Sequence, residues 1–112
     1  MVLGTDRRRQ PREWIAVLVS YGGAGAFDYT DNLSTTGMFL FTRRRWRVGT
    51  RVHFVLSFPG LLQSLPLAGV VRWRREGDAG EGGVGLEFDE VDARARALLD
   101  AFLAEVRRIP ED

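Results

Sequence analysis

The sequence predicts a mainly β fold, a six-stranded antiparallel barrel with one amphipathic α-helix at its C-terminal end. Three observations support this fold class. Six short runs rich in β-branched and aromatic residues follow one another at intervals of roughly 8–12 residues, which is typical of antiparallel barrels and sandwiches. Glycines separate most of these runs. After residue 90 the apolar positions change to helical spacing.

The expected strands cover residues 14–21, 27–34, 38–41, 51–58, 67–75 and 84–88. The strand at 51–58 alternates most clearly, because Val52, Phe54, Leu56 and Phe58 fall on one face of an extended chain. The glycines at positions 22, 23 and 25 indicate a connection between the first two strands.

The fifth strand and its surroundings carry two further expectations. Residues 61–66 are expected to form a loop after the Pro-Gly pair that ends the preceding strand. Within the strand, alternation assigns Val71 and Trp73 to one face and Arg72 and Arg74 to the other. The tryptophans of the chain are expected in the core or at its rim rather than as ligand platforms.

The C-terminal segment has apolar residues at spacings of three and four, which defines one face of a helix. These residues are Val91, Ala95, Leu98, Leu99, Phe102, Leu103 and Val106. Either Asp89 or Asp92 is expected to cap the N-terminus of this helix, and Pro110 to end it. The chain therefore divides into a flexible arm at residues 1–12, a barrel with its helix at 13–108, and a tail at 109–112.

Composition limits the possible functions. At 112 residues the chain fits one domain, and the absence of cysteine excludes disulfides and thiolate catalysis. No apolar run approaches the roughly 20 residues of a membrane span, and no secretory signal precedes the first strand, so a cytoplasmic location is expected. All basic residues are arginines, as a GC-rich genome favours, and they gather around positions 7–12, 43–47 and 72–75 as candidate anion contacts.

Residue patterns of catalysis are weak in this sequence. The single histidine, His53, lies on a strand without an acidic neighbour in sequence, so it does not read as a general base. Asp28 and Asp31 lie three apart on an extended segment, which directs them to opposite faces. The glycines after the first strand do not open a helix, as a dinucleotide site requires. We expect neither an enzyme nor a metal site.

Two short motifs remain, and their order is informative. Arg8 and Arg12 lie four apart on a segment that Pro11 keeps from being helical, and residues 32–37 read NLSTTG at a strand turn. Alone, the first is an ordinary solvated tail and the second an ordinary turn, because Asn, Ser and Gly are turn residues. Their joint occurrence in the expected strand context favours a binding site.

In this order the motifs resemble the signature of the PilZ family, RxxxR followed by [D/N]xSxxG. Four later segments are similar to landmarks of the family and follow in the same order: Phe39 with Phe41, residues 48–50, residues 69–73 and residues 83–88. The resemblance therefore covers about residues 6–106. The resemblance implies a PilZ-type barrel in a bacterial receptor for cyclic di-GMP that is not an enzyme. It implies signalling through an unidentified protein partner as the arm orders on the ligand.

The resemblance also assigns roles at the site. Arg8 and Arg12 would contact guanines and phosphates, since guanine presents O6 and N7 as paired acceptors for an arginine fork. Asn32 would hydrogen-bond a base edge, Ser34 would contact a base or a phosphate, and Gly37 would allow a close approach that a Cβ would block.

Three neighbouring residues extend the candidate site. Arg9 and Asp31 lie beside the motif residues and are further candidates for ligand contact. Arg7 precedes the first motif arginine, and the resemblance links an arginine at that place to binding of an intercalated pair of cyclic di-GMP molecules.

Two alternative functions stay open at this point. The chain could be an interaction module of the same fold that does not bind nucleotide and serves motility or pilus function. It could also be a barrel that binds single-stranded nucleic acid, since Trp46 lies within the second arginine block. A net charge of only +1 argues against the second alternative.

Overall fold

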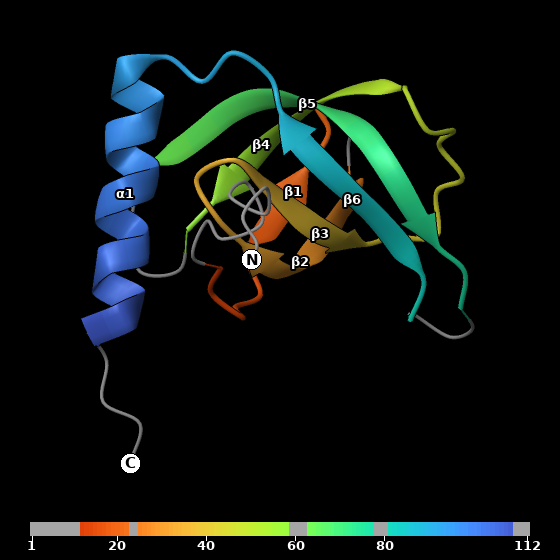
Figure 1. Cartoon of the computed structure of the whole chain (residues 1–112), viewed down its shortest axis with the longest axis horizontal. Helices are drawn as coiled ribbons and strands as arrows, with labels where there is room; N and C mark the ends of the chain where they lie inside the picture. The colour runs from red at the N-terminus through yellow and green to blue at the C-terminus, as the bar shows by residue number, and fades with distance from the viewer. Residues whose placement is uncertain (1–11, 23–24, 59–62, 78–80, 109–112) are drawn as a thin grey trace, which may run out of the picture.

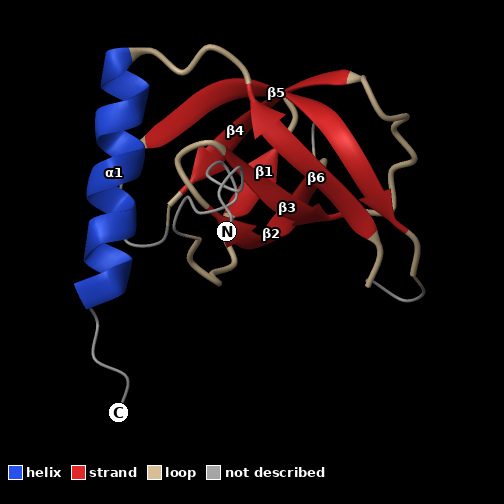
Figure 2. Ribbon diagram, in the orientation of Figure 1, coloured by secondary structure: helices blue, strands red, loops and turns tan. Residues whose placement is uncertain are grey.

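The computed structural model describes residues 12–22, 25–58, 63–77 and 81–108. Within these residues the elements follow in the order β1 (Leu18–Ser20), β2 (Phe27–Leu33), β3 (Gly37–Phe41), β4 (Arg51–Ser57), β5 (Ser64–Arg75), β6 (Gly83–Phe88) and α1 (Ala93–Arg108). The six strands form a closed antiparallel barrel in the order β1-β2-β3-β6-β5-β4, with the helix outside it (Figures 1 and 2). The predicted fold class is confirmed.

The first strand is shorter than expected. Only Leu18–Ser20 pairs with β2 and β4, whereas residues 14–21 were expected to be extended in a ladder. The buried Thr30 of β2 replaces ladder bonds for the preceding segment, because its hydroxyl donates to the carbonyl of Ile15 at 2.6 Å and accepts from the amide of Val17 at 2.9 Å. A register shift on β2 between Thr30 and Asn32 accompanies this arrangement.

The loop expected at residues 61–66 was placed too far along the chain, because β5 already begins at Ser64 and Pro66 pairs with Val55 of β4. Proline is tolerated there because β6 pairs with β5 only from Gly69 onward. The carbonyl of Ala68 accepts from the amide of Asp89 and so faces away from β4, and Pro66, two residues earlier on the strand, has the same orientation. The nitrogen of Pro66 therefore lies on the unpaired side of β5, where a missing N–H breaks no ladder.

The expected faces of β5 were wrong at Trp73. Val71 pairs with Leu86 and Trp73 pairs with Gly85, so a bulge at Arg72 shifts the register by one residue. Val71 is fully buried in the barrel, whereas Trp73 is 49% exposed on its outer face. The alternation of faces predicted from the sequence fails after Arg72, because the bulge moves the later side chains of the strand to the opposite face.

The core joins the barrel interior to one face of the helix. Its largest fully buried members include Leu33, Met38, Leu40, Leu56, Leu99 and Leu103. Phe58, directly after β4, stacks on Phe102 of α1 with ring centroids 4.3 Å apart, which fixes the helix beside the barrel (Figure 1). Of the two expected caps, Asp92 is the one observed, since its Oδ1 accepts from the amide of Ala95 at 2.8 Å.

Within the described ranges, the structure contains no helix with the length and apolar character needed to cross a bilayer.

Candidate functional site

The root of the N-terminal arm is fixed to the end of β2 by the backbone. Glu13 and Leu33 exchange both backbone hydrogen bonds, at 2.9 and 3.0 Å, as an isolated antiparallel bridge. In this antiparallel register the neighbours of Glu13 and Leu33 share one face, so Arg12 lies diagonally across from Asn32. The Arg12 Nη1 donates to the Asn32 Oδ1 at 2.8 Å, which joins the two motifs in space.

Arg12 remains a cation in this position. The residue as a whole is exposed, but partial burial of its guanidinium lowers the pKa of Arg12 from its ordinary value. An arginine nevertheless stays charged at neutral pH, so the group keeps its donors for an anionic ligand. Asn32 is buried and already holds one of these donors, which orients the guanidinium at the end of β2.

Ser34 lies inside the turn that follows β2. Its side chain is fully buried, and its hydroxyl accepts from the amides of Thr36 and Gly37, both at 3.2 Å. The amide of Ser34 in turn donates to the carbonyl of Gly37 at 2.9 Å. In this structure the hydroxyl therefore serves the turn itself, whereas the resemblance implied contact with a base or a phosphate.

Gly37 allows two strands to approach closely. A Cβ at this position would lie 2.4 Å from the carbonyl oxygen of Leu86 on β6. The glycine is thus required by the pairing of β3 with β6, which positions the turn at the edge of the site.

A hollow of about 820 Å³ opens on the outer face of the barrel next to these residues. It is called the β6 hollow here because the outer side of β6 forms its floor. Its charged and polar lining includes Arg12, Asp31, Asn32, Arg72, Arg75 and Glu87, and its aromatic lining consists of Trp14, Phe39 and Trp73. The volume falls within the range of small-molecule sites, about 300–1,000 Å³.

The aromatic floor depends on a second glycine. Phe39, Gly85 and Trp73 occupy neighbouring positions on β3, β6 and β5, so the two rings meet across the glycine. Their centroids are 5.1 Å apart and the rings are stacked, and a Cβ on Gly85 would lie 2.2 Å from the Trp73 Nε1. Trp14, 74% exposed, lines the same hollow near the root of the arm.

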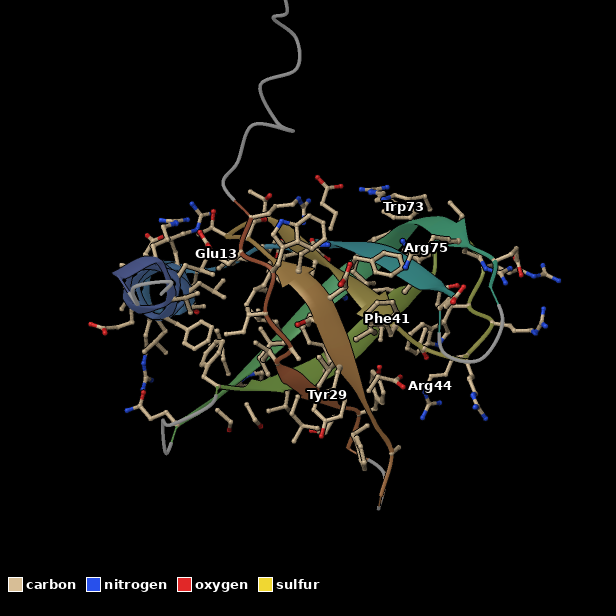
Figure 3. The ribbon with its side chains drawn as sticks, turned by 90° about the horizontal axis from the view of Figure 1, so that it is seen from below. Glu13, Tyr29, Phe41, Arg44, Trp73 and Arg75 are labelled. Atoms are coloured by element: carbon tan, nitrogen blue, oxygen red, sulfur yellow. The ribbon has the colours of Figure 1, made fainter. Side chains whose placement is uncertain are left out.

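Two arginines of β5 reach the same surface. Arg72 pairs with Glu87 at 2.6 Å, so its charge is balanced locally. The Arg75 guanidinium lies over the ring of Phe39, 4.3 Å from its centroid, and donates from Nε to the carbonyl of Glu81 at 3.1 Å. Figure 3 shows Arg75 between Trp73 and Phe41 on this face. Cationic forks and aromatic faces therefore share one concave surface.

The structure brings most of the predicted site residues together. Arg12, Asn32 and Gly37 line the β6 hollow, as does Asp31, and Ser34 supports the turn behind them. Arg7, Arg8 and Arg9 lie outside the described residues. The sequence analysis did not identify Trp14 and Trp73 as lining residues. The position of Trp73 on the outer face follows from its pairing with Gly85, which the sequence of β5 alone does not reveal.

The chain matches one family model and several solved structures. The family model described as PilZ domain matches residues 6–105. The structure of the Bacillus subtilis inhibitor of motility (MotI/DgrA) is 16% identical with a TM-score of 0.73, over 92% of this chain and 53% of that one. YcgR from Escherichia coli in complex with c-di-GMP is 16% identical with a TM-score of 0.74, over 91% and 46%.

The chain thus spans about half the length of those two proteins. The PilZ domain of Escherichia coli YcgR with c-di-GMP is 16% identical with a TM-score of 0.68, and there the match covers 91% of this chain and 92% of that one. A search of curated proteins by sequence found no match. A family match over nearly all of the chain, on a closed six-stranded barrel of the same fold, shows that the chain belongs to the PilZ domain family.

Proposed function

We propose that this protein is a receptor for cyclic di-GMP that signals through a protein partner. The observation that carries the proposal is the hydrogen bond between Arg12 and Asn32, 2.8 Å long, at the edge of the β6 hollow. It joins the arginine motif to the asparagine–serine–glycine motif, 20 residues further along the chain, beside a hollow large enough for a nucleotide.

The lining of the β6 hollow suits the chemistry of this ligand. Guanine offers O6 and N7 to a bidentate arginine, and such a pair contributes about 1–3 kcal/mol of discrimination. Asn32 accepts from Arg12 through Oδ1, which leaves its amide group to donate to a base edge. Trp73 stacked on Phe39 provides an aromatic floor on which a purine can stack, at about 1–3 kcal/mol per base.

In this proposal the phosphates are bound by guanidinium groups that form no ion pair. Arg12 and Arg75 both line the hollow, and neither has an acidic partner within the described residues. Arg8 and Arg9 would add further forks from the arm, which would order over the ligand. Ser34 then acts by holding the turn that presents Gly37, rather than by direct contact.

The proposed output is a changed surface that a partner recognises. A structural relative is named an inhibitor of motility, and two structures of YcgR contain c-di-GMP. These descriptions support a bacterial adaptor with a role in motility as the working assignment, and we propose a cytoplasmic location for it. A ligand that orders the arm shifts an order–disorder equilibrium, which is a common way to create a binding surface.

Isothermal titration of the full chain with cyclic di-GMP tests the proposal. We expect a Kd in the micromolar range or tighter, about −8 kcal/mol or stronger. Cyclic di-AMP is the control ligand, because adenine lacks the paired O6 and N7 acceptors, and it should bind at least tenfold more weakly. Equal affinity for the two dinucleotides, or no binding of either, would contradict the assignment.

Two variants locate the binding. Arg12→Ala should weaken cyclic di-GMP at least tenfold, since it removes the fork at the side of Asn32. Arg96→Ala, on the exposed face of α1, is the matched control and should bind within twofold of the original chain. If Arg96→Ala lost as much affinity as Arg12→Ala, the ligand would be held by the overall charge of the protein and not by the proposed site.

The ligand stoichiometry tests the role of Arg7. We propose that the third arginine of the arm allows an intercalated pair of ligands, so the titration should give two cyclic di-GMP molecules per chain. Arg7→Ala should reduce this number to one. One ligand per chain with Arg7 intact would refute the pair.

A further inference from the structure

Two more hollows adjoin the candidate ligand site on the outer face of the barrel. The first, the arginine hollow, has a volume of about 320 Å³ and is lined by Arg43, Arg44, Arg45, Arg74 and Arg75 among others. The second, the aromatic hollow, has a volume of about 660 Å³; its lining includes the rings of Phe27, Tyr29 and Phe41, the guanidinium groups of Arg43 and Arg44, and the carboxylate of Asp28, which pairs with Arg44. Neither hollow is needed by the proposed nucleotide site, apart from the shared Arg75.

The hollows form one continuous surface. Arg75 lines both the β6 hollow and the arginine hollow, while Arg43 and Arg44 line both the arginine hollow and the aromatic hollow. Figure 3 shows Trp73, Arg75 and Phe41 one below another, with Arg44 and Tyr29 on either side below them.

Two of the five arginines are already neutralised. Arg44 lies 3.9 Å from Asp28, and its guanidinium lies over the ring of Tyr21 at 4.6 Å. Tyr21 also donates to Asp28 at 2.7 Å, and burial together with this bond raises the pKa of Tyr21 well above its ordinary value. Arg74 pairs with Glu76 at 3.1 Å.

The remaining arginines keep their charge available. Among the described residues, no carboxylate lies within 4.0 Å of Arg43 or Arg45, and both side chains are exposed. Arg75 is held only by the carbonyl of Glu81 and by aromatic rings. Three separate guanidinium forks thus face solvent, each able to bind a carboxylate in bidentate fashion.

The aromatic hollow adds an apolar component beside these forks. Phe27 and Tyr29 are 53% and 48% exposed, and they pack edge to face with centroids 5.9 Å apart. Tyr29 lies opposite Phe41 on β3, so the exposed rings continue toward the ring pair of the β6 hollow. Aromatic side chains exposed together next to arginine are typical of protein interfaces.

We propose that the surface formed by the arginine and aromatic hollows docks an acidic segment of a partner protein, with an apolar side chain of that segment seated on Phe27 and Tyr29. Charge complementarity selects this occupant. Along the chain the free Arg43 and Arg45 flank the paired Arg44, and each free fork suits one carboxylate in bidentate fashion. A net charge of only +1 disfavours the continuous charge of a phosphate backbone as the occupant. Phe27 and Tyr29 also use each other as packing partners, which reduces the ring area open to stacking bases.

This inference goes beyond the proposed nucleotide receptor and does not depend on it. The test uses the full chain without nucleotide, in a selection from a library of random 12-residue peptides. Enriched peptides should carry at least two Asp or Glu residues next to a large apolar residue. A synthetic peptide of the enriched sequence, labelled with a fluorophore, then gives affinities by fluorescence polarisation.

Variants tie the peptide to the surface. Arg43→Glu with Arg45→Glu should weaken the peptide at least tenfold, whereas Arg94→Glu with Arg96→Glu on α1 should leave its affinity within twofold. Phe27→Ser should weaken it at least threefold and, being an exposed position, should leave the melting temperature nearly unchanged. Selection of peptides without acidic residues, or equal binding to the Arg43 and Arg45 double variant, would overturn the proposal.

A 15-residue oligothymidine provides the last arm of the test. Binding of this oligonucleotide that is tighter than that of the peptide, and is lost in the same double variant, would assign the surface to nucleic acid and overturn the protein partner.

Discussion

The turn at residues 32–37 and the root of the N-terminal arm border the same hollow, but they are held in very different ways. In the turn, the buried Ser34 hydroxyl bonds two backbone amides, and Gly37 packs directly on the backbone of β6. At the arm root, the exposed Arg12 is oriented by one side-chain hydrogen bond to Asn32. The turn is therefore built into the barrel, whereas the side chain of Arg12 lies on the surface of the barrel.

This difference separates stability from recognition. A change in the turn disturbs strand pairing and buried hydrogen bonds, so it should alter folding and ligand binding together. A change at Arg12 removes donors from the hollow but leaves the core intact, so it should alter binding alone. Four variants test this separation, from the largest expected effect on free energy to the smallest.

Gly37→Ala should have the largest effect. The added methyl group would lie 2.4 Å from the carbonyl oxygen of Leu86, so β3 and β6 must separate. We expect a loss of about 2–3 kcal/mol in the free energy of unfolding, measured by urea denaturation. Gly49→Ala is the control, because its φ of +98° disfavours alanine but nothing lies within 4 Å, and it should lose about 1 kcal/mol. Equal losses would refute the steric explanation.

Ser34→Ala should come next. The amides of Thr36 and Gly37 would lose their acceptor in a buried turn, which lowers the free energy of unfolding by about 2 kcal/mol. Thermal denaturation followed by circular dichroism should show a corresponding fall in melting temperature of roughly 8 °C. Ser64→Ala, at an exposed strand position, should change it little. A stable Ser34→Ala variant that binds cyclic di-GMP poorly would instead assign the hydroxyl to the ligand.

Arg12→Ala should show the opposite behaviour to the turn variants. Its tenfold loss of nucleotide affinity corresponds to about 1.4 kcal/mol of binding free energy. Its free energy of unfolding without ligand should stay within about 0.5 kcal/mol of the original value, because the side chain is exposed. Urea denaturation with and without saturating nucleotide measures both quantities. Substantial destabilisation without ligand would mean that the arm root belongs to the core.

Glu13→Gln should have the smallest effect. Arg107 of α1 donates to the Glu13 carboxylate, which links the arm root to the helix. An ion pair of this exposure contributes about 0.5 kcal/mol, and the backbone bridge between Glu13 and Leu33 remains in the variant. Nucleotide affinity should therefore change less than twofold by calorimetry. A tenfold loss would show that the helix, and not the β2 backbone, positions Arg12.

The parts of the fold that follow local rules could be predicted from the sequence. The alternation in β4 and the spacing of three and four in α1 are properties of single segments, and both elements lie close to their expected bounds. The bulge at Arg72 and the start of β5 at Ser64 depend on which strand lies alongside, so the sequence of β5 alone could not reveal them.

The candidate site shows the same limit. The proximity of Arg12 to Asn32 was expected only because two motifs resembled a family signature, since 20 residues separate them. The ring pair of Trp73 and Phe39 escaped prediction because it requires Gly85 between them, a relation among three strands. Residues that reach the hollow only because particular strands pair are therefore missed when each segment of the sequence is considered alone.

The stacking of Trp73 across Gly85 also gives the molecule an optical property. Two of its three tryptophans, Trp14 and Trp73, are more than two-fifths exposed and border the β6 hollow, while Trp46 packs against Tyr21 elsewhere. We therefore expect the tryptophan emission of the unlabelled chain to change when a ligand fills this hollow. If it does, the protein needs no added label to report occupancy of the proposed site.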